Sequence, residues 1–235
     1  MSSDGWMKWD TERVAKEIRA HNDAYWQRNQ PVISDYEYDR MVQRLRLLNP
    51  EHSTLNDLGA PANVQGTSVR HERAMLSLDK AYDEKSLLHW AGKFDGELVM
   101  SPKVDGVACS IRYEDGRLKV AATRGSGSVG EDITQNVLQI VDVPRQLSDG
   151  PANIEVRGEV YLPLTAFERV KDQLANPRNA TAGALKQKKA NRVKALGIRF
   201  MAYDVIGLEV STEIEKLKYA AQWGFSTVEQ TLVSR

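Results

Sequence analysis

The sequence has little cysteine, no long apolar run and no net charge, and each absence excludes something. The one cysteine, Cys109, excludes an internal disulfide and favours a reducing compartment. No apolar run approaches the roughly 18 residues that a membrane-spanning helix needs. The first ten residues, MSSDGWMKWD, lack the apolar core of a signal peptide. We therefore expect a cytoplasmic protein that has no membrane partner.

The balance of charge limits how this chain can bind nucleic acid. Lys and Arg number 32 among the 235 residues, and Asp and Glu also number 32, so the formal net charge is zero. A protein that held a phosphate backbone through this chain alone should be more basic. Either the substrate is not nucleic acid, or most of the contact with it lies elsewhere.

Residues 1–68 predict a small helical unit followed by a linker. Asp10 suits the N-cap of a first helix. The apolar stripe of that helix has four members: Val14, Ile18, His21 and Tyr25. Ser34 and Glu37 have the spacing of a capping box at the start of a second helix, which should end at Asn49. The stretch from 56 to 69 is rich in Gly, Pro and Asn, which indicates a linker.

Residues 69–235 predict a second domain with a mixed, largely antiparallel sheet, so the expected fold class is α+β. From residue 107 to 113 apolar and polar residues alternate, as in a strand. Asp115-Gly116 then predicts a two-residue hairpin turn. The register of that hairpin places Val107 opposite Arg124, and Lys103 opposite the glycine loop 125–130.

The second half of this domain predicts one further polar strand face and two helices. In the strand 154–162, three charged residues share the face opposite the apolar one: Glu155, Arg157 and Glu159. Thr165 and Glu168 have the spacing of a helix cap, and residues 175–189 suggest a loop. A buried strand from 198 to 210 and an amphipathic helix from 212 to 223 complete the prediction.

Lys103 is a candidate nucleophile, although a lysine at a strand end is most often simply solvated. An amine attacks only when it is unprotonated, a state that neighbouring cations favour. Asp105 could orient the lysine or hold a metal ion, and Arg124 could meet a phosphate or an acidic partner. Glu159 lies on the polar face of a neighbouring strand. These neighbours favour a nucleophilic role for Lys103, which its position at a strand end alone does not indicate.

Other candidates have strong structural interpretations. The loop GSGSVG matches the dinucleotide fingerprint G-x-G-x-x-G weakly, because the strand before it belongs to a hairpin rather than to a βαβ unit. In the second helix, Asp35 suits the helix dipole, Tyr38 can pack at its start and Asp39 can be a solvated charge. Tyr203 lies in an apolar strand, where a tyrosine is more often part of the core.

Seven segments together resemble the N-terminal part of the NAD-dependent, bacterial-type DNA ligases. They occur in the order of that family and cover nearly the whole chain: PVISDYEYDRMVQRLRLLNPEH, RHERAMLSLDKAYD, KVDGVACSIRYEDGRL, ATRGSGSVGEDITQNV, IEVRGEVYLP, ANPRNATAGAL and RFMAYDV. The resemblance implies a helical hairpin that binds nicotinamide mononucleotide (NMN), within residues 1–68. For residues 69–235 it implies a nucleotidyltransferase domain of the ATP-grasp-like ligase type, mainly antiparallel sheets with flanking helices.

The resemblance also implies the chemistry of the site. Lys103 matches the lysine that attacks the adenylyl phosphorus of NAD, releases NMN and forms lysyl-AMP. The family then passes AMP to the 5′-phosphate of a DNA nick, and the 3′-hydroxyl displaces it to seal the strand. Asp105 and Glu159 match acidic positions near the ribose and a catalytic Mg²⁺, whose exact ligands are not assigned. NAD and Mg²⁺ are thus the expected cofactors.

Cofactor contacts follow residue by residue from the same match. The adenylate side is expected to involve Ser77, Leu78, Ser101, Val104, Arg124, Glu159, Arg178, Lys186 and Tyr203, with Tyr203 stacking on adenine. The NMN side is expected to involve Tyr25, Trp26, Asp35, Tyr36, Glu37, Tyr38 and Asp39.

Three residues depart from the family pattern. Ser101 stands where the family usually has Glu, Trp26 where His or Tyr is common, and Lys186 where an arginine fork is usual. The later lysine motifs and the DNA-wrapping domains of the family do not occur in this sequence. We therefore expect nicked duplex DNA to be bound mainly through domains or a polypeptide beyond this chain, and the chain alone to be incomplete as a ligase.

Two alternatives stay open. One is a degenerate ligase-like module that binds a nucleotide or a partner without chemistry, which Ser101 would favour. The other is a capping-type or RNA-ligase nucleotidyltransferase, which shares the K-x-D-G pattern but gives no reason for the ISDYEYDR helix.

Overall fold

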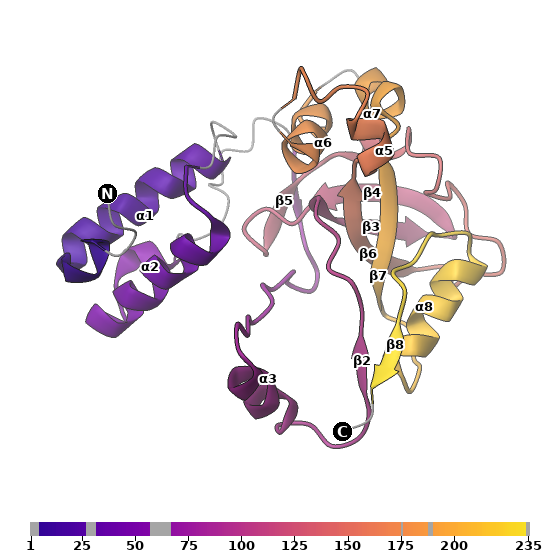
Figure 1. The fold of residues 1–235 in the computed structure, drawn as a ribbon. Coiled ribbons are helices and arrows are strands. Elements are labelled where there is room, and N and C mark those ends of the chain that lie inside the picture. Colours follow the sequence, from indigo (N-terminus) through magenta and orange to yellow (C-terminus); the bar gives the residue numbers. More distant parts are fainter. Residues whose placement is uncertain (1–4, 27–31, 57–66, 175, 188–189, 234–235) are drawn as a thin grey trace. The chain divides into compact units, whose positions relative to one another are not determined.

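The computed structural model describes residues 5–26, 32–56, 67–174, 176–187 and 190–233 (Figure 1). Contacts within the chain divide it into two compact units, Met1–Asn63 and Val64–Arg235. Among the described residues, no helix is both long enough and apolar enough to cross a membrane.

The first unit is a helical hairpin with two short 3₁₀ turns. Helices α1 (Thr11–Trp26) and α2 (Asp35–Leu48) are accompanied by η1 (Gly5–Lys8) and η2 (Ser53–Asn56). Val14, Ile18 and Leu45 are fully buried and form the centre of the helical core. Val14 and Ile18 belong to the stripe predicted for the first helix, and His21 of that stripe is half-buried. The linker predicted at 56–69 lies mostly outside the described residues.

Local signals in the sequence set the ends of these helices. The Arg13 N–H donates to Asp10 Oδ1 at 2.9 Å, so the predicted N-cap of α1 is confirmed. Both halves of the Ser34–Glu37 capping box form at the start of α2, and Asn49 is its C-cap. Each cap satisfies backbone groups that a helix end leaves without partners.

The second unit is built on a four-stranded antiparallel sheet in the order β4-β3-β6-β7. These strands are β3 (Val107–Glu114), β4 (Arg117–Thr123), β6 (Ile154–Tyr161) and β7 (Arg199–Ile206). Ile111, Val156 and Phe200 are fully buried on one face, where the main hydrophobic core forms. The predicted α+β class, with an antiparallel sheet after a helical unit, is confirmed.

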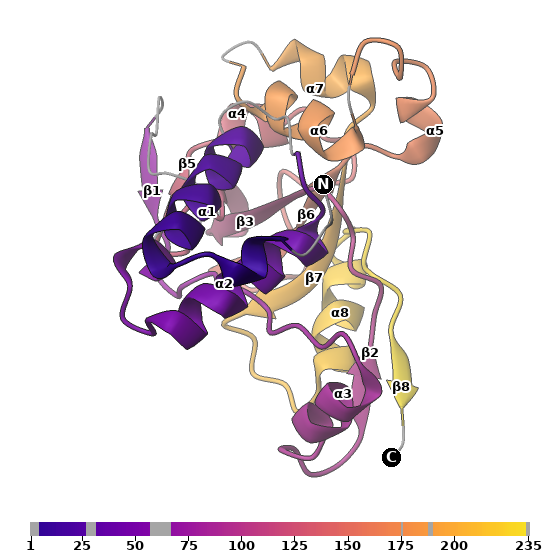
Figure 2. The same ribbon diagram turned by 60° about the vertical axis from the view of Figure 1, so that its left-hand side comes forward.

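The helices of the second unit are α3 (Glu84–Ala91), α4 (Thr134–Val137), α5 (Leu164–Phe167), α6 (Pro177–Leu185), α7 (Asn191–Leu196) and α8 (Glu213–Gln222). Helix α3 has no buried residue, whereas the other helices contribute apolar side chains to the core on the sheet. Figures 1 and 2 show α5, α6 and α7 together at one end of β6 and β7, with α8 beside β7. The predicted helix at 212–223 is confirmed: Thr212 and Glu215 cap it, and Gly224 follows with φ of 95°.

Two small sheets accompany the main one. Strand β1 (Ser68–Arg70) pairs with β5 (Val129–Glu131), and β2 (Leu98–Met100) pairs with β8 (Thr231–Val233). The loop Ser101–Gly106 leads from β2 into β3, and it contains Lys103.

The predicted hairpin forms, but its register was wrong beyond the first two pairs. Asp115 and Gly116 form the turn with φ of 50° and 69°, and Tyr113 lies opposite Leu118 as expected. A bulge between Arg112 and Tyr113 then shifts the pairing by one residue. The Arg124 N–H consequently donates to the Ala108 carbonyl at 3.1 Å, so Arg124 is not paired with Val107. Lys103 lies before β3 begins, so it has no partner in this hairpin.

Two further predictions were wrong. Residues 177–185, predicted as loop, form α6, because Asn176 accepts a hydrogen bond from the Asn179 N–H as N-cap and Pro177 takes the first helical position. The cap predicted at Thr165 does not form, because α5 already begins at Leu164, after Pro163, and has no side-chain cap.

Candidate active site

The face of the main sheet opposite the core carries charged residues that are nevertheless buried. On β6, Glu155, Arg157 and Glu159 alternate on this face, and each is 7–9% exposed. Ser110 on β3 lies opposite Arg157, and Ala108 lies opposite Glu159. Buried charges are costly unless they are paired or bind a ligand, so this face is where a functional site is expected.

Glu159 lies at the end of this face that is nearest the Lys103 loop. Burial raises the pKa of its carboxyl to about 7, although Lys103 and Arg178 oppose the rise. Asp105 adds to it, and the Gly106 N–H donates a hydrogen bond that lowers the pKa. Gly106 is required here, because a Cβ at that position would collide with the Val160 carbonyl oxygen.

The loop that carries Lys103 is open to solvent on its other side. Ser101, Lys103 and Asp105 are exposed, and Val104 is half-buried. Arg178 Nη1 lies 3.2 Å from Asp105 Oδ1, which ties the start of α6 to this loop. The structure thus brings Lys103, Asp105 and Arg178 together around the buried carboxylate of Glu159. It places an amine that solvent can reach beside acidic and basic groups of the kind that bind phosphate or a metal ion.

Lys186 lies at the other end of α6 from Arg178. It is the C-cap residue and is exposed. Eight helical steps of about 1.5 Å separate the two backbones by roughly 12 Å. The structure therefore joins Arg178, but not Lys186, to the Asp105 carboxylate.

The glycine loop is a turn between two strands, so a Rossmann interpretation is wrong. Gly125 and Gly127 have φ of 54° and 95°, and the loop leads from β4 directly into β5. Arg124, half-buried, lies at its start. The loop also holds the segment before α3, because the Met75 N–H donates to the Gly127 carbonyl at 2.9 Å.

Ser77 and Leu78 follow directly after this anchored segment. Both side chains are exposed, Leu78 by 75%. Residues 71–83 form no helix or strand, so the position of these two residues depends on the anchors that precede them.

Tyr203 is the extra residue of a β-bulge. Arg157 lies opposite Asp204, while its neighbour Gly158 lies opposite Ala202, so Tyr203 has no partner in the ladder. Its side chain is 37% exposed, and burial, followed by the charge of Glu159, raises the pKa of its hydroxyl. A bulge of this kind re-aims a side chain, and here it leaves an aromatic ring part open beside the buried charges.

The helical unit holds the other group of predicted residues. Tyr36 is half exposed, with the Arg40 guanidinium 5.7 Å from its ring centroid, and Glu37 completes the capping box. The Tyr38 hydroxyl donates to Asn22 Oδ1 at 2.7 Å, and burial raises the pKa of Tyr38 to about 12. Asp39 is half-buried. The side chains of Tyr25, Trp26 and Asp35 lie outside the described residues.

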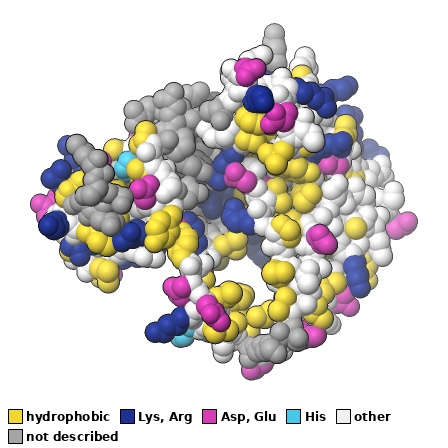
Figure 3. All heavy atoms as spheres, in the orientation of Figure 1, with side chains coloured by type: hydrophobic (Ala, Val, Ile, Leu, Met, Phe, Trp, Pro, Cys, Tyr) yellow, Lys and Arg dark blue, Asp and Glu magenta, His cyan; other side chains and the backbone are white. Residues whose placement is uncertain are grey.

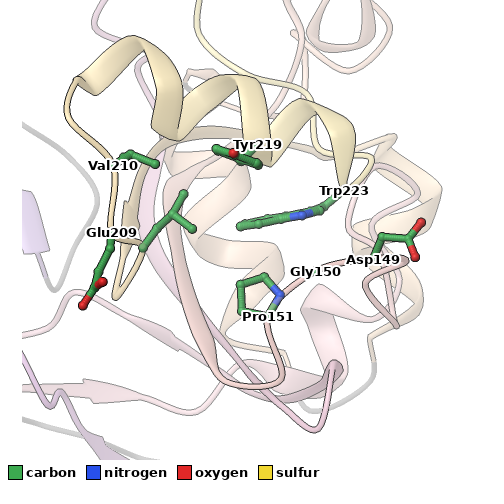
Figure 4. Close-up of a pocket in the computed structure, with 8 residues that line it drawn as sticks. Asp149, Gly150, Pro151, Glu209, Val210, Tyr219 and Trp223 are labelled. Carbon is green, nitrogen blue, oxygen red and sulfur yellow. The ribbon is translucent and has the colours of Figure 1, made fainter.

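The described residues contain no metal-ligating cluster, and one cavity among them lies away from the predicted site residues. No group of three or more His, Cys, Asp or Glu side chains that could hold a metal ion occurs there. A cavity of about 330 Å³ opens between α8 and the turn at Gly150, with Trp223 and Tyr219 on one side (Figure 4). None of the predicted site residues lines it, so the Lys103 cluster stays the candidate site.

Sequence reasoning missed one network in this site. The Arg157 Nε donates to Glu155 Oε1 at 2.6 Å, and the Ser110 hydroxyl donates to the same oxygen at 2.7 Å. Arg157 also donates to the carbonyls of Arg73 and Ala74. Charged residues alternating with apolar ones on a buried strand were the available signal, but the two carbonyls that Arg157 binds lie more than 80 residues away in the chain.

Comparison with known proteins covers the chain from residue 7 to residue 234. The family model described as "NAD-dependent DNA ligase adenylation domain" matches residues 64–234. The one described as "DNA ligase-like, N-terminal NAD+-binding domain" matches residues 7–64.

Curated relatives named DNA ligase match most of this chain. The protein of Wolbachia pipientis wMel is 40% identical over 95% of this chain and 35% of its own length. That of the Wolbachia strain wPip is 39% identical over 91% and 34%. That of Thermotoga maritima is 36% identical over 92% and 35%. The chain thus spans about a third of the length of these relatives. A solved structure titled "Pmar-Lig_Pre." aligns with 87% of this chain and 41% of its own, at a TM-score of 0.42 and 14% identity, and is only a distant likeness.

Proposed function

We propose that this chain, which belongs to the NAD-dependent DNA ligase adenylation family, transfers the adenylyl group of NAD to Lys103. The Lys103 Nζ would attack the adenylyl phosphorus, forming a P–N bond as the P–O bond to NMN breaks. Lys103 attacks as the neutral amine, and the proton that its nitrogen gives up passes to solvent, which reaches this exposed side chain. NMN leaves, and AMP stays on the lysine as a phosphoramide. One observation carries the proposal: Lys103, Asp105 and Arg178 gather around the buried Glu159.

The neighbours of Lys103 have distinct proposed roles. Arg178, oriented by Asp105, and Arg124, at the start of the glycine loop, would bind the phosphates, since planar guanidinium groups suit phosphate oxygens. Tyr203 would stack on adenine, with Ser77 and Leu78 on the adenosine and Ser101, Val104 and Lys186 as further contacts. Glu159 would contact the ribose or a metal ion.

Mg²⁺ fits the carboxylates beside the lysine. It commonly takes one or two carboxylates together with substrate phosphates, so the pair Asp105 and Glu159 suffices without a larger cluster. When bound, it would stabilise negative charge on the phosphates and favour the neutral form of a nearby lysine. We propose these two residues as its protein ligands.

The helical unit would bind the NMN half of NAD. The half-exposed ring of Tyr36 offers a stacking surface, and Tyr38 and Asp39 offer polar groups. The proposed contacts include Tyr25, Trp26, Asp35 and Glu37 as well. The proposed division of the chain follows these roles, with an NMN-binding subdomain and linker in residues 1–68 and the adenylation domain in residues 69–235.

Nicked duplex DNA is the proposed acceptor of the adenylyl group. Between residues 173 and 203 the chain has seven basic residues and no acidic one: Arg178, Lys186, Lys188, Lys189, Arg192, Lys194 and Arg199. Since the whole chain is neutral, the remainder carries the compensating negative charge. Arg192 and Lys194 are exposed on α7, and Figure 3 shows Lys and Arg side chains over the region of α5–α7. Such a segregated basic surface suits a phosphate backbone. The cytoplasmic location stays a prediction.

Labelled NAD tests the nucleophile. The chain is incubated with NAD carrying a labelled adenylyl group and Mg²⁺, beside Lys103→Arg and the control Lys119→Arg, which changes an exposed lysine on β4. We expect label on the wild type and on Lys119→Arg and none on Lys103→Arg. Equal labelling of all three would overturn the assignment. Labelled ATP in a parallel arm separates an NAD-dependent enzyme from one that uses a nucleoside triphosphate.

A further inference from the structure

We propose that Arg157 is a positioning residue, which holds residues 73–78 in place for the adenosine half of NAD. The inference rests on the proposed function, because it concerns the site where Ser77 and Leu78 would contact adenosine. Arg157 itself acts through the backbone of this segment.

The Arg157 guanidinium is buried and uses its three nitrogens for different partners. Its side chain is 9% exposed. The Nε donates to Glu155 Oε1 at 2.6 Å, Nη1 donates to the Ala74 carbonyl at 3.1 Å, and Nη2 donates to the Arg73 carbonyl. Two consecutive carbonyls from a distant segment are therefore fixed to β6 by one side chain.

Glu155 and Ser110 keep this guanidinium in place. Glu155 Oε1 accepts from both Arg157 and the Ser110 hydroxyl, and the Glu155 side chain is 8% exposed. A buried arginine without a carboxylate would be costly, so the pair is needed for the clamp to exist. The whole network lies on the sheet face that also carries Glu159.

The clamped segment has few other supports. Residues 71–83 form no helix or strand, and residues 76–83 are exposed. His71 and Met75 are buried, and their N–H groups donate to Ser128 and Gly127 of the glycine loop, each at 2.9 Å. The carbonyls of Arg73 and Ala74 point to Arg157. Ser77 lies two residues after Met75, the last of these anchored residues, so the position of Ser77 depends directly on them.

Arg157 also stands between two parts of the proposed adenine site. The bulge that exposes Tyr203 begins where Arg157 pairs with Asp204. Glu159, two residues further along β6, faces the Lys103 loop. A single strand thus carries the carboxylate beside the nucleophile and the clamp for the adenosine segment. Loss of the clamp should weaken NAD binding and leave the chemistry at Lys103 intact.

The test compares Arg157→Lys with Arg112→Lys in the 235-residue chain. Lysine keeps the charge, but its single ammonium cannot reproduce the fork that meets Glu155 and two carbonyls. Arg112 is a matched control, because it reaches the same segment from the next strand through a solvent-exposed pair with Glu72 at 3.0 Å. Such a pair contributes little.

Two measurements are made on each variant. The first is the rate of lysyl-AMP formation against NAD concentration, and the second is hydrogen exchange of the backbone amides in residues 72–82. For Arg157→Lys we expect KM for NAD to rise about tenfold, with the rate at saturating NAD within about twofold of wild type. Exchange in residues 72–82 should be faster. Arg112→Lys should match the wild type in both.

The outcomes separate this inference from the proposed function. Unchanged KM and unchanged exchange in Arg157→Lys would overturn the positioning role while the adenylation proposal stands. A roughly tenfold fall in the saturating rate of Arg157→Lys, with its KM for NAD unchanged, would also overturn the positioning role. If the wild type forms no lysyl-AMP, the proposed function fails and this inference fails with it. Should Arg157→Lys not fold, as judged by thermal melting, Glu155→Gln gives the same test, since it weakens the anchor of the guanidinium and should raise KM severalfold.

Discussion

Two carboxylates on β6 are buried to the same degree and have different surroundings. Glu155 accepts from an arginine at 2.6 Å and a serine at 2.7 Å, so its charge is matched within the protein. Glu159, four residues along the same face, accepts a backbone N–H, and its nearest charges belong to a solvent-exposed loop and the start of α6. Burial raises the pKa of Glu159 to about 7. Two carboxylates of similar burial on one strand therefore differ in what surrounds them, and we propose that Glu159, beside the Lys103 loop, is the one that acts in adenylation.

The largest expected difference between the two carboxylates is in adenylation. Glu159→Gln should slow lysyl-AMP formation at saturating NAD about 100-fold, because it removes a proposed carboxylate ligand of the Mg²⁺ that would stabilise charge on the reacting phosphate. Glu155→Gln should leave the saturating rate within about threefold and change mainly KM, since Glu155 acts through Arg157. Single-turnover rates over a range of NAD concentrations measure both. Equal losses of saturating rate in the two variants would break the contrast.

The second difference is in how stability depends on pH. A carboxyl whose pKa is raised by folding binds its proton more tightly in the folded state. The contribution of Glu159 is therefore fully present below its ordinary pKa of 4.5 and is lost as pH rises through about 7. The wild type should lose roughly 3 kcal/mol of unfolding free energy over this range relative to Glu159→Gln.

Urea unfolding at about pH 4 and about pH 8 measures this loss for the wild type and Glu159→Gln. Asp142 also has a raised pKa, caused by burial, but it is present in both proteins and cancels in the comparison. A wild type whose stability changes with pH in the same way as that of Glu159→Gln would show that the carboxyl of Glu159 is not buried as described.

A smaller effect is expected further from β6, on the basic surface that begins at Arg178. Arg192→Ala combined with Lys194→Ala should lower by about two the slope of log affinity against log salt for a nicked duplex, because two phosphate contacts are lost. Lys85→Ala with Lys218→Ala, two exposed lysines on α3 and α8, is the control and should leave the slope unchanged. Fluorescence anisotropy at several salt concentrations gives both slopes. If both double variants had the same slope of log affinity against log salt, DNA would not bind at the surface that carries Arg192 and Lys194.

Features fixed by neighbouring residues could be predicted from the sequence. The Ser34–Glu37 box, the cap by Thr212 and the Asp115-Gly116 turn each depend on fewer than five residues. The bulges at Lys119 and Tyr203 could not be predicted, because they depend on how side chains pack across the sheet. Helix α6 was missed because an Asn-Pro pair is a signal for a loop as well as for the start of a helix.

The site divides in the same way. Lys103, Asp105 and Glu159 were candidates from their spacing and from the family resemblance. The structure places Lys103 and Asp105 beside the buried carboxylate of Glu159. Arg157 binds the carbonyls of Ala74 and Arg73, which are separated from it by 83 and 84 positions in the chain, so no local pattern could reveal this clamp. Long-range hydrogen bonds of this kind become visible only when the fold is known.

The central claim is that Lys103 accepts the adenylyl group, and peptide mapping by mass spectrometry tests it most directly. The chain is incubated with NAD and Mg²⁺, digested, and the peptide that contains residues 101–106 is sequenced. The account predicts a mass increase of one adenylyl group on Lys103, in an amount that depends on NAD. An adenylyl group on another lysine, or NAD bound without any covalent product, would contradict it.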